Sequence, residues 1–353
     1  MLGALRLLLA LFVVATHLSG RGFFAHCGIF AVFGFYVISG YLMTLILNDT
    51  YHSNSRAFFL NRFLRLFPIY YVIAIITLIS INVIPNASEY HDAWLIKYRM
   101  IDFLGNTFIF PFVFYDHSFR LTPPTWSIAV ELVNYFLLWA IIARRWYLPV
   151  LFGVAASVYH ATCLILGEPW TMIYYPFYAA ILPFSIGSGL YFIQKNIIKA
   201  TPFQFRVKFL VAISFGAFVA NVCVDGMFAV EKPDYIKFFF YTNLVAISTL
   251  VFLLINVKKP KYKKWDKFLG DLSYPVFLTH WLVGFYVSSI LHPDVWTGPD
   301  IFWLSALISI IISIILSHYT NKLIEPIRSR VRHMRSSDNG LTSVPKNKSG
   351  MVG

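Results

Sequence analysis

The amino-acid sequence predicts an all-α fold, a polytopic transmembrane bundle of about ten helices, and two observations carry that prediction. The 353 residues are 58% hydrophobic and only 13% charged, whereas an ordinary soluble domain has roughly 25% charged residues. Apolar runs of about 20 residues recur along the chain, and each is long enough to cross a hydrocarbon core of roughly 30 Å. A water-soluble fold could not bury so much apolar surface, so the chain is expected to cross a lipid bilayer several times.

Apolar length and loop punctuation place the expected crossings in order. The first, 2–20, lacks a small-residue cleavage site after it, so we expect a retained helix rather than a signal peptide. The other full crossings are expected at 27–48, 66–85, 125–143, 146–166, 172–194, 207–224, 236–257, 268–291 and 301–323. The apolar stretch 106–115 is expected to be a short or re-entrant piece. Residues 1–327 are expected to form one membrane domain, and 328–353 a basic, disordered cytoplasmic tail.

The distribution of Lys and Arg predicts the orientation of the bundle, because short cytoplasmic loops retain these residues. With the N-terminus inside, the expected cytoplasmic segments hold Arg56, Arg62, Arg65, Arg144, Arg145, Lys195, Lys199, Arg206, Lys208, Lys258, Lys259, Lys261, Lys263, Lys264, Lys267, Arg328, Arg330, Arg332, Arg335, Lys346 and Lys348. The expected outer loops hold only Arg21, Lys97, Arg99, Arg120, Lys232 and Lys237. This bias predicts that both termini lie in the cytoplasm and that the number of crossings is even. The expected location is the cell (inner) membrane. Because the net charge of +13 sits in short loops, it does not indicate a nucleic-acid partner.

Ionisable side chains at membrane depth are costly, so they are candidate functional residues. Arg6 and His17 stand eleven positions apart in the first helix, which puts them within roughly 20° of the same face and about 16 Å apart along the axis. One face would then present a cation near one end and a titratable base further along. Alternatively, Arg6 extends to the membrane interface and His17 packs as a satisfied polar residue.

Two further groups of charged residues are candidates. Arg62 and Arg65 stand at i and i+3 at the entry to the third crossing, so their guanidinium groups share a face and could clamp phosphate oxygens. For this pair alone, positive charge that anchors the helix end is the favoured interpretation. Glu131, in TWSIAVELVNYF, needs a partner, and either an inward-facing base such as His17 or an arginine would serve.

The remaining candidates have less specific surroundings. His280 lies in an aromatic-rich helix, where a histidine is more often a packing residue, and Glu325 has basic neighbours and could form only an interfacial ion pair. Cys27, Cys163 and Cys223 lack the even count of a disulfide framework and the spacing of metal ligands, so no metal site is expected.

Six segments along the chain stand out together: LRLLLALFVVATH, GFYVISGYL, RAFFLNRFLRLFPIYY, TWSIAVELVNYF, LGDLSYPVFLTHW and LIEPIR. In combination they resemble the acyltransferase-3 family, the integral-membrane acyltransferases that O-acylate sugars of cell-surface polysaccharides and related molecules. No single segment is specific, but their order, the Arg-to-His interval and the Arg-x-x-Arg make the combination so. The resemblance covers the chain from the first helix to the last.

The resemblance implies that an acyl group, most commonly acetyl, moves from cytoplasmic acyl-coenzyme A to a carbohydrate hydroxyl on the outer side. It implies His17 as general base or relay, Arg6 as its partner, and Arg62 and Arg65 as the pair that meets the donor. Glu131 completes the expected catalytic group, and the further structural or substrate contacts considered are Ser39, Tyr41, Trp126, Ser127, His280 and Glu325. The expected partners are acyl-coenzyme A as a substrate, the carbohydrate and the bilayer, without a bound cofactor.

The sequence departs from the family pattern at two positions, and other function classes stay open. Tyr41 stands where the family usually has Phe, and Leu132 follows Glu131 where members often have a second acidic residue. The tail is too short for the soluble esterase-like domain that some members carry. A transporter or flippase could use the same Arg and His, but we find no internal repeat in the sequence. A non-catalytic membrane partner would give no reason for Arg6 and His17 to share a helix.

Overall fold

The computed structural model describes residues 1–20, 22–51, 54–84, 87–96, 99–114, 119–196, 204–228, 235–257, 262–292 and 295–333. Its long helices are α1 (Leu2–Leu18), α2 (Cys27–Leu45), α3 (Ser55–Val83), α6 (Thr125–Leu137), α7 (Leu148–Ile165), α8 (Ile181–Asn196), α9 (Gln204–Phe228), α10 (Ile236–Asn256), α11 (Lys263–Leu291) and α12 (Pro299–His333). The short helices α4 (Ala87–Tyr90) and α5 (Met100–Phe108) lie between α3 and α6. The described residues contain no strand.

The apolar character of these helices confirms an all-α, multi-pass membrane protein. Among the described residues, 8 helices are long and apolar enough to cross a membrane, and α1 is apolar but shorter. The number of crossings and the location of the termini stay predictions. Of the expected loop and tail charges, Arg21, Lys97, Lys199, Lys232, Lys258, Lys259, Lys261, Arg335, Lys346 and Lys348 lie outside the described residues.

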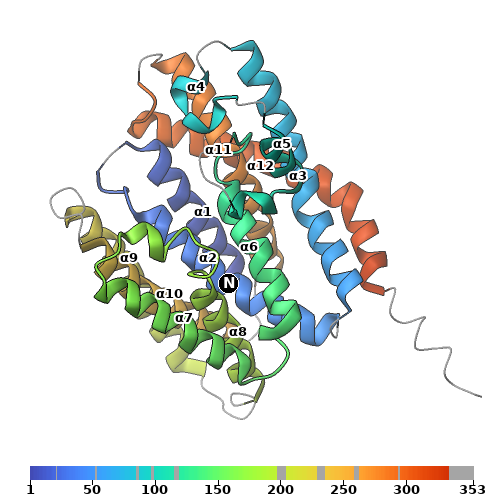
Figure 1. Ribbon diagram of the computed structural model, residues 1–353, viewed down its shortest axis with the longest axis vertical. Helices are drawn as coiled ribbons and strands as arrows, with labels where there is room; N and C mark the ends of the chain where they lie inside the picture. Colours follow the sequence, from blue (N-terminus) through green and yellow to red (C-terminus); the bar gives the residue numbers. More distant parts are fainter. Residues whose placement is uncertain are drawn as a thin grey trace, which may run out of the picture.

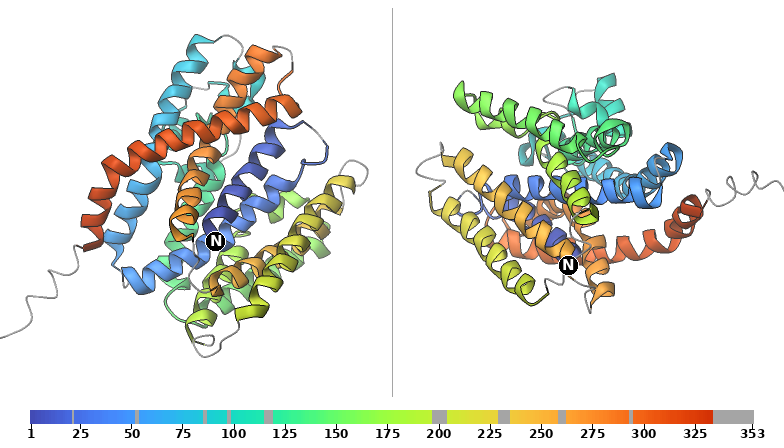
Figure 2. Two further views of the ribbon diagram at one scale, coloured as in Figure 1. Left: turned by 180° about the vertical axis from the view of Figure 1, so that it is seen from behind. Right: turned by 90° about the horizontal axis from the view of Figure 1, so that it is seen from below.

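The antiparallel pair α1 and α2 lies inside the bundle, and the other long helices surround it (Figures 1 and 2). α1 packs against α2 and α11, while α2 also packs against α8 and α10. α12 packs against both α11 and α3. Because α1 is enclosed by protein, its polar side chains face neighbouring helices, and this placement exposes Arg6 and His17 to internal cavities rather than to lipid.

Small residues let α2 and α8 cross closely. A Cβ atom at Gly40 would meet the backbone carbonyl of Phe184, and one at Gly187 would meet the backbone of Val37. Helices in lipid associate largely through such close backbone packing, because lipid tails are as apolar as the side chains. The crossing fixes the rotation of α2, so that neighbouring Ser39 contacts α6 instead of α8.

Two helix boundaries differ from the prediction. α3 begins at Ser55 rather than at 66, because the side-chain oxygen of Asn54 caps it by accepting a hydrogen bond of 3.1 Å from the Ala57 amide. The expected crossing at 172–194 is also wrong at its start. Trp170–Ile173 form a single 3₁₀ turn, and α8 begins only at Ile181, since Pro176 lacks the N–H that a continuous helix would use.

The ends of two other expected segments also shift. α12 continues to His333, past the expected boundary at 328, because Glu325 forms ion pairs with Arg328 and Arg332 on the same helix. The rest of the expected tail, 334–353, lies outside the described residues. The piece expected at 106–115 is short, as predicted, but its helix begins earlier: α5 runs from Met100 to Phe108, and a 3₁₀ turn follows at Phe110–Val113.

Candidate active site

Three arginines surround a small cavity of about 70 Å³ between α1, α2, α3, α6 and α11, called here the arginine cavity. Arg6 comes from α1, and Arg62 and Arg65 come from successive turns of α3. The predicted shared face of Arg62 and Arg65 is therefore confirmed. Both residues lie well inside α3 and not at its entry, since the helix begins before them.

The guanidinium groups of this cavity retain hydrogen-bonding capacity. Nη2 of Arg62 lies 3.4 Å from the side-chain oxygen of Asn61, whereas its buried Nε has no hydrogen-bond partner. Arg6 and Arg65 form no hydrogen bond or ion pair with the part of the chain that the structure describes. Cations in a low-dielectric site attract anions strongly, so this cavity is suited to an anionic or strongly polar ligand.

Glu131 lies in the same cavity and accepts hydrogen bonds from the Ser39 hydroxyl and the Tyr135 hydroxyl. Of the two partners that the sequence left open, His17 is not the one observed, since Nδ1 of His17 is bonded to His280. Glu131 stands five residues after Trp126 on α6, about 7.5 Å further along the axis. Trp126 lines the cavities that contain His17, whereas Glu131 lines neither of them. Glu131 is instead close enough to Arg6 to interact electrostatically, which is the alternative that the sequence left open.

A second cavity, of about 330 Å³, opens at the end of the bundle where α1 begins, called here the basic end. It shares Arg6, Leu42 and Arg65 with the arginine cavity. Its wall also carries Lys267, Arg328, Arg332, Asp266, Asp271 and Glu325. Glu325 forms the expected ion pair, with Arg328 Nη1 at 2.8 Å and with Arg332.

Two further cavities lie beyond the arginine cavity. The middle cavity, of about 230 Å³, shares Val32, Ser127 and Phe277 with the arginine cavity and contains His17. The outer cavity, of about 760 Å³, shares His17 and Trp126 with the middle cavity. The four cavities therefore follow one another through the bundle from the basic end to its opposite end, with common wall residues at each junction.

His17 and His280 are joined by a hydrogen bond of 2.9 Å between Nδ1 of His17 and Nε2 of His280. Nδ1 of His280 lies 2.7 Å from the carbonyl oxygen of Phe277, which can only accept, so this nitrogen carries the hydrogen. Nε2 of a neutral His280 must then accept from His17 Nδ1. The lone pair of His17 is consequently on Nε2, as a general base requires.

Aromatic side chains form much of the wall around His17. Trp126 packs edge to face on Tyr175, with ring centroids 4.7 Å apart, and both residues line the middle and outer cavities. Trp170 and Tyr174 complete this wall in the middle cavity. The sequence interpretation did not identify these residues, because it placed Tyr174 and Tyr175 within the expected crossing at 172–194 and Trp170 in the connection before it.

The other candidate contacts have structural partners. The Tyr41 hydroxyl donates to the side-chain oxygen of Gln194 at 2.6 Å and lies outside the four cavities, so it ties α2 to α8. The Ser127 hydroxyl donates to the Pro124 carbonyl at 2.9 Å within the first turn of α6. Its backbone carbonyl accepts from Tyr36, which fixes α6 against α2 at the junction of the arginine and middle cavities.

Comparison with known proteins agrees with this architecture. The profile of the acyltransferase domain family Acyl_transf_3 matches residues 2–318. The chain is 23% identical to Peptidoglycan O-acetyltransferase OatA of Listeria monocytogenes over 364 residues, covering 92% of this chain and 55% of that protein. This chain thus spans about half the length of that relative. No solved structure matches this chain. Because the family profile extends over nearly all of the membrane bundle, the chain belongs to the acyltransferase-3 family, as its motifs indicated.

Proposed function

We propose that this membrane acyltransferase transfers an acetyl group from acetyl-coenzyme A to a hydroxyl of a cell-surface carbohydrate, in the inner membrane and with its basic end in the cytoplasm. The four neighbouring cavities between the basic end and the surroundings of His17 carry this proposal, because they offer separate places for a donor and an acceptor. The similarity to a peptidoglycan O-acetyltransferase supports both the acetyl group and a cell-wall type of acceptor.

The basic end suits the phosphates of coenzyme A. Arginine forks bind phosphate oxygens through two parallel hydrogen bonds, and Arg6 and Arg65 belong to both the basic-end cavity and the arginine cavity. The slender pantetheine arm would then pass through the arginine cavity. Since Arg6 and His17 are separated by about 16 Å along α1, an extended arm would bring the thioester toward His17.

The middle and outer cavities suit a sugar. Aromatic rings give large, rigid contact surfaces on which the apolar faces of sugar rings can pack. Trp126 and Tyr175 supply such surfaces beside His17 in both cavities. The acceptor would therefore enter from the end of the bundle opposite the donor and present one hydroxyl to the imidazole.

The chemistry assigned to His17 is general-base catalysis. Nε2 removes the proton of the acceptor hydroxyl as its oxygen attacks the thioester carbonyl carbon. The new C–O ester bond forms, the C–S bond breaks, and the thiolate of coenzyme A leaves with the bonding electron pair. The proton then passes from the imidazolium to the thiolate, which restores neutral His17 and balances the reaction. His280 keeps His17 in the tautomer that begins this cycle.

Transfer of label from acetyl-coenzyme A to glycan tests this proposal. Purified protein in lipid vesicles would be incubated with acetyl-labelled acetyl-coenzyme A and a membrane glycan fraction. We expect alkali-labile label on the glycan with the wild type and with the control His160→Gln. His160 is buried between Tyr241 and the Ala179 carbonyl, outside the four cavities. Glycan that stays unlabelled, or that is labelled equally by His17→Ala, would contradict the proposal.

A further inference from the structure

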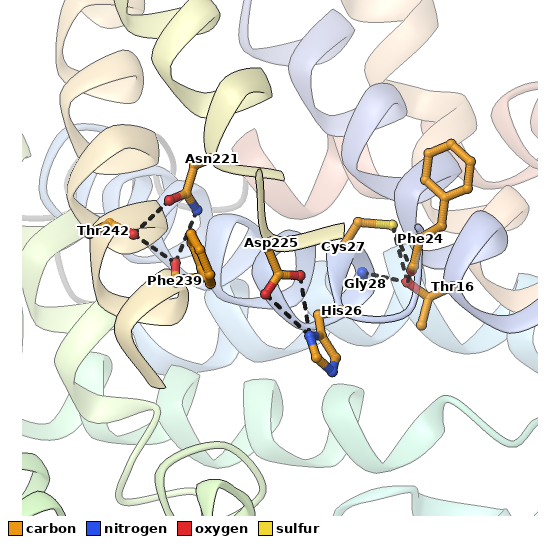
Figure 3. A network of polar contacts seen from close by, with 9 residues as sticks. All are labelled: Thr16, Phe24, His26, Cys27, Gly28, Asn221, Asp225, Phe239 and Thr242. Atoms are coloured by element: carbon orange, nitrogen blue, oxygen red, sulfur yellow. Dashed lines mark hydrogen bonds and ion pairs between the residues drawn. The ribbon is translucent and has the colours of Figure 1, made fainter. Parts of the chain in front are cut away.

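A second histidine faces the middle cavity and is bound to a buried carboxylate (Figure 3). Nδ1 of His26 lies 3.2 Å from both carboxylate oxygens of Asp225, which is on α9. The Asp225 side chain is 3% exposed and that of His26 is 18% exposed. Because a carboxylate only accepts hydrogen bonds, Nδ1 carries the hydrogen and Nε2 keeps its bonding capacity for another partner.

The segment that carries His26 is fastened to α1 directly beside His17. The Thr16 hydroxyl donates to the Phe24 carbonyl at 2.8 Å and accepts from the Gly28 amide at 2.6 Å (Figure 3). The Cys27 thiol donates to the Phe12 carbonyl at 3.1 Å. His26 is therefore held from two sides, by α1 through its own segment and by α9 through Asp225.

The position of His26 suits a second polar contact to the acceptor, which His17 alone does not provide. His17 and His26 both line the middle cavity, whose wall also carries Trp126 and Tyr175. An aromatic wall binds a sugar ring but leaves its rotation free, and one base contacts only one hydroxyl. A second polar contact at a fixed place would select which hydroxyl reaches His17.

We propose that His26 is an acceptor-binding residue, whose Nε2 hydrogen-bonds a second hydroxyl or amide of the carbohydrate while His17 acts on the hydroxyl to be acylated. Asp225 is its positioning residue, because it holds the ring and its tautomer. This inference rests on the proposed function and deepens it: the acceptor must carry a hydrogen-bonding group next to the acylated hydroxyl. The competing explanation is a purely structural tie between α9 and the start of α2.

The other polar link of α9 provides a matched control. The Asn221 side chain donates to the Phe239 carbonyl at 3.0 Å and accepts from the Thr242 hydroxyl at 2.6 Å, so it ties α9 to α10 (Figure 3). Asn221 stands one helical turn before Asp225 and lies outside the middle cavity. Asn221→Ala loosens the attachment of α9 without touching His26.

The experiment measures coenzyme A release while a membrane glycan fraction and acetyl-coenzyme A are varied separately. We expect His26→Ala to raise the KM for glycan about tenfold, which corresponds to about 1.4 kcal/mol, with the KM for acetyl-coenzyme A unchanged. His26→Gln, which can still form a hydrogen bond, should recover part of this loss, and Asp225→Ala should resemble His26→Ala more weakly. Asn221→Ala should leave the KM for glycan unchanged.

Each other outcome is informative. An unchanged KM for glycan in His26→Ala and His26→Gln would overturn the inference and leave the structural tie. Equal effects of Asn221→Ala and His26→Ala on this KM would do the same. If His26→Ala does not fold, titration of glycan into His26→Gln, followed by tryptophan fluorescence, must still show weakened binding. A wild type without glycan-dependent turnover would refute the proposed function itself, which is a different result from turnover that ignores His26.

Discussion

The hydrogen bond of 2.9 Å from His17 to His280 determines which nitrogen of His17 is available as a base. The two ring planes are nearly parallel, with an interplanar angle of 3°. Their centroids lie 5.1 Å apart, and together with the short distance between Nδ1 and Nε2 this places the contact edge to edge. His280 is fully buried and fixed by the Phe277 carbonyl. A histidine that the sequence describes as a packing residue is thereby a positioning residue for the proposed base.

Replacement of His280 should reduce turnover without affecting donor binding. Loss of a general base costs about 10²- to 10⁴-fold, and His280→Ala should reach the lower part of that range because His17 remains but its tautomer is free. His280→Gln should retain more activity, since its side-chain oxygen can accept from Nδ1. The measurement is the pH dependence of kcat, which should change shape in His280→Ala. An unchanged profile with a lowered unfolding temperature would indicate packing alone.

Replacement of Arg65 should weaken the binding of acetyl-coenzyme A. Arg65 lines both the basic-end and arginine cavities, so Arg65→Ala should raise the KM for acetyl-coenzyme A about tenfold or more, with a smaller salt dependence than the wild type. Arg65→Lys keeps the positive charge but loses the forked guanidinium group, so its KM for acetyl-coenzyme A should lie between those of the wild type and Arg65→Ala. Arg144 lies in the exposed turn that follows Leu138–Ile142, where its Nε donates to the Trp139 carbonyl, and it gives the control Arg144→Ala. Equal donor constants in all these proteins would exclude a donor role.

The fold was largely predictable because long apolar segments in lipid have few structural options. Only a helix satisfies all of its own backbone hydrogen bonds in lipid, so apolar length located α2, α7 and α10 within a few residues. Boundaries failed where a local feature outweighed hydropathy. The Asn54 cap moved the start of α3, and the aromatic, proline-containing segment before Ile181 has helix-like hydropathy without being a helix.

The site was predictable only in part because helix periodicity gives the face of a residue but not the neighbour that it meets. The shared face of Arg62 and Arg65 follows from their spacing and is observed. His280, the partner of His17, lies on α11, 263 residues further along the chain, and no spacing rule identifies it. The same holds for His26 and Asp225, which are 199 residues apart in the sequence.

The close crossing of α2 and α8 should not tolerate a side chain. A Cβ at position 187 would meet the Val37 carbonyl and lie 2.7 Å from the Tyr41 amide nitrogen. Gly187→Val should therefore lower the stability by about 1–3 kcal/mol or prevent folding. A Cβ atom at Gly189, on the same helix, would meet no atom within 4 Å, so Gly189→Ala should be neutral or slightly stabilising. Thermal unfolding in detergent compares the two, and equal midpoints would contradict close packing here.

His91, between α3 and α5 and outside the spanning helices, should make stability depend on pH. Burial and the positive charge of Arg120 lower the pKa of His91 from 6.5 to about 4, with Asp92 opposing them. In the unfolded chain His91 would bind a proton as the pH falls through 6.5, whereas in the folded chain it stays neutral until the pH approaches 4. Its stabilising contribution is therefore complete above pH 6.5 and is lost as the pH falls toward 4.

His91→Gln removes this contribution, so the unfolding temperature of the wild type should decrease more steeply between pH 6.5 and 4 than that of the variant. His91 packs edge to face on Trp281 with centroids 4.3 Å apart, so an offset between the two curves is expected at all pH values. Parallel curves would show that His91 does not titrate differently in the folded chain.

The most direct test of acyl transfer through the bundle is the glycan-dependent release of coenzyme A from acetyl-coenzyme A, measured for the wild type, His17→Ala and Arg65→Ala. We predict turnover by the wild type, a kcat lowered about 10²-fold or more in His17→Ala with the donor KM retained, and a raised donor KM in Arg65→Ala. All three proteins should insert and unfold alike. Absence of glycan-dependent turnover by the wild type with every acyl-coenzyme A tried, or equal kcat in His17→Ala, would contradict this account.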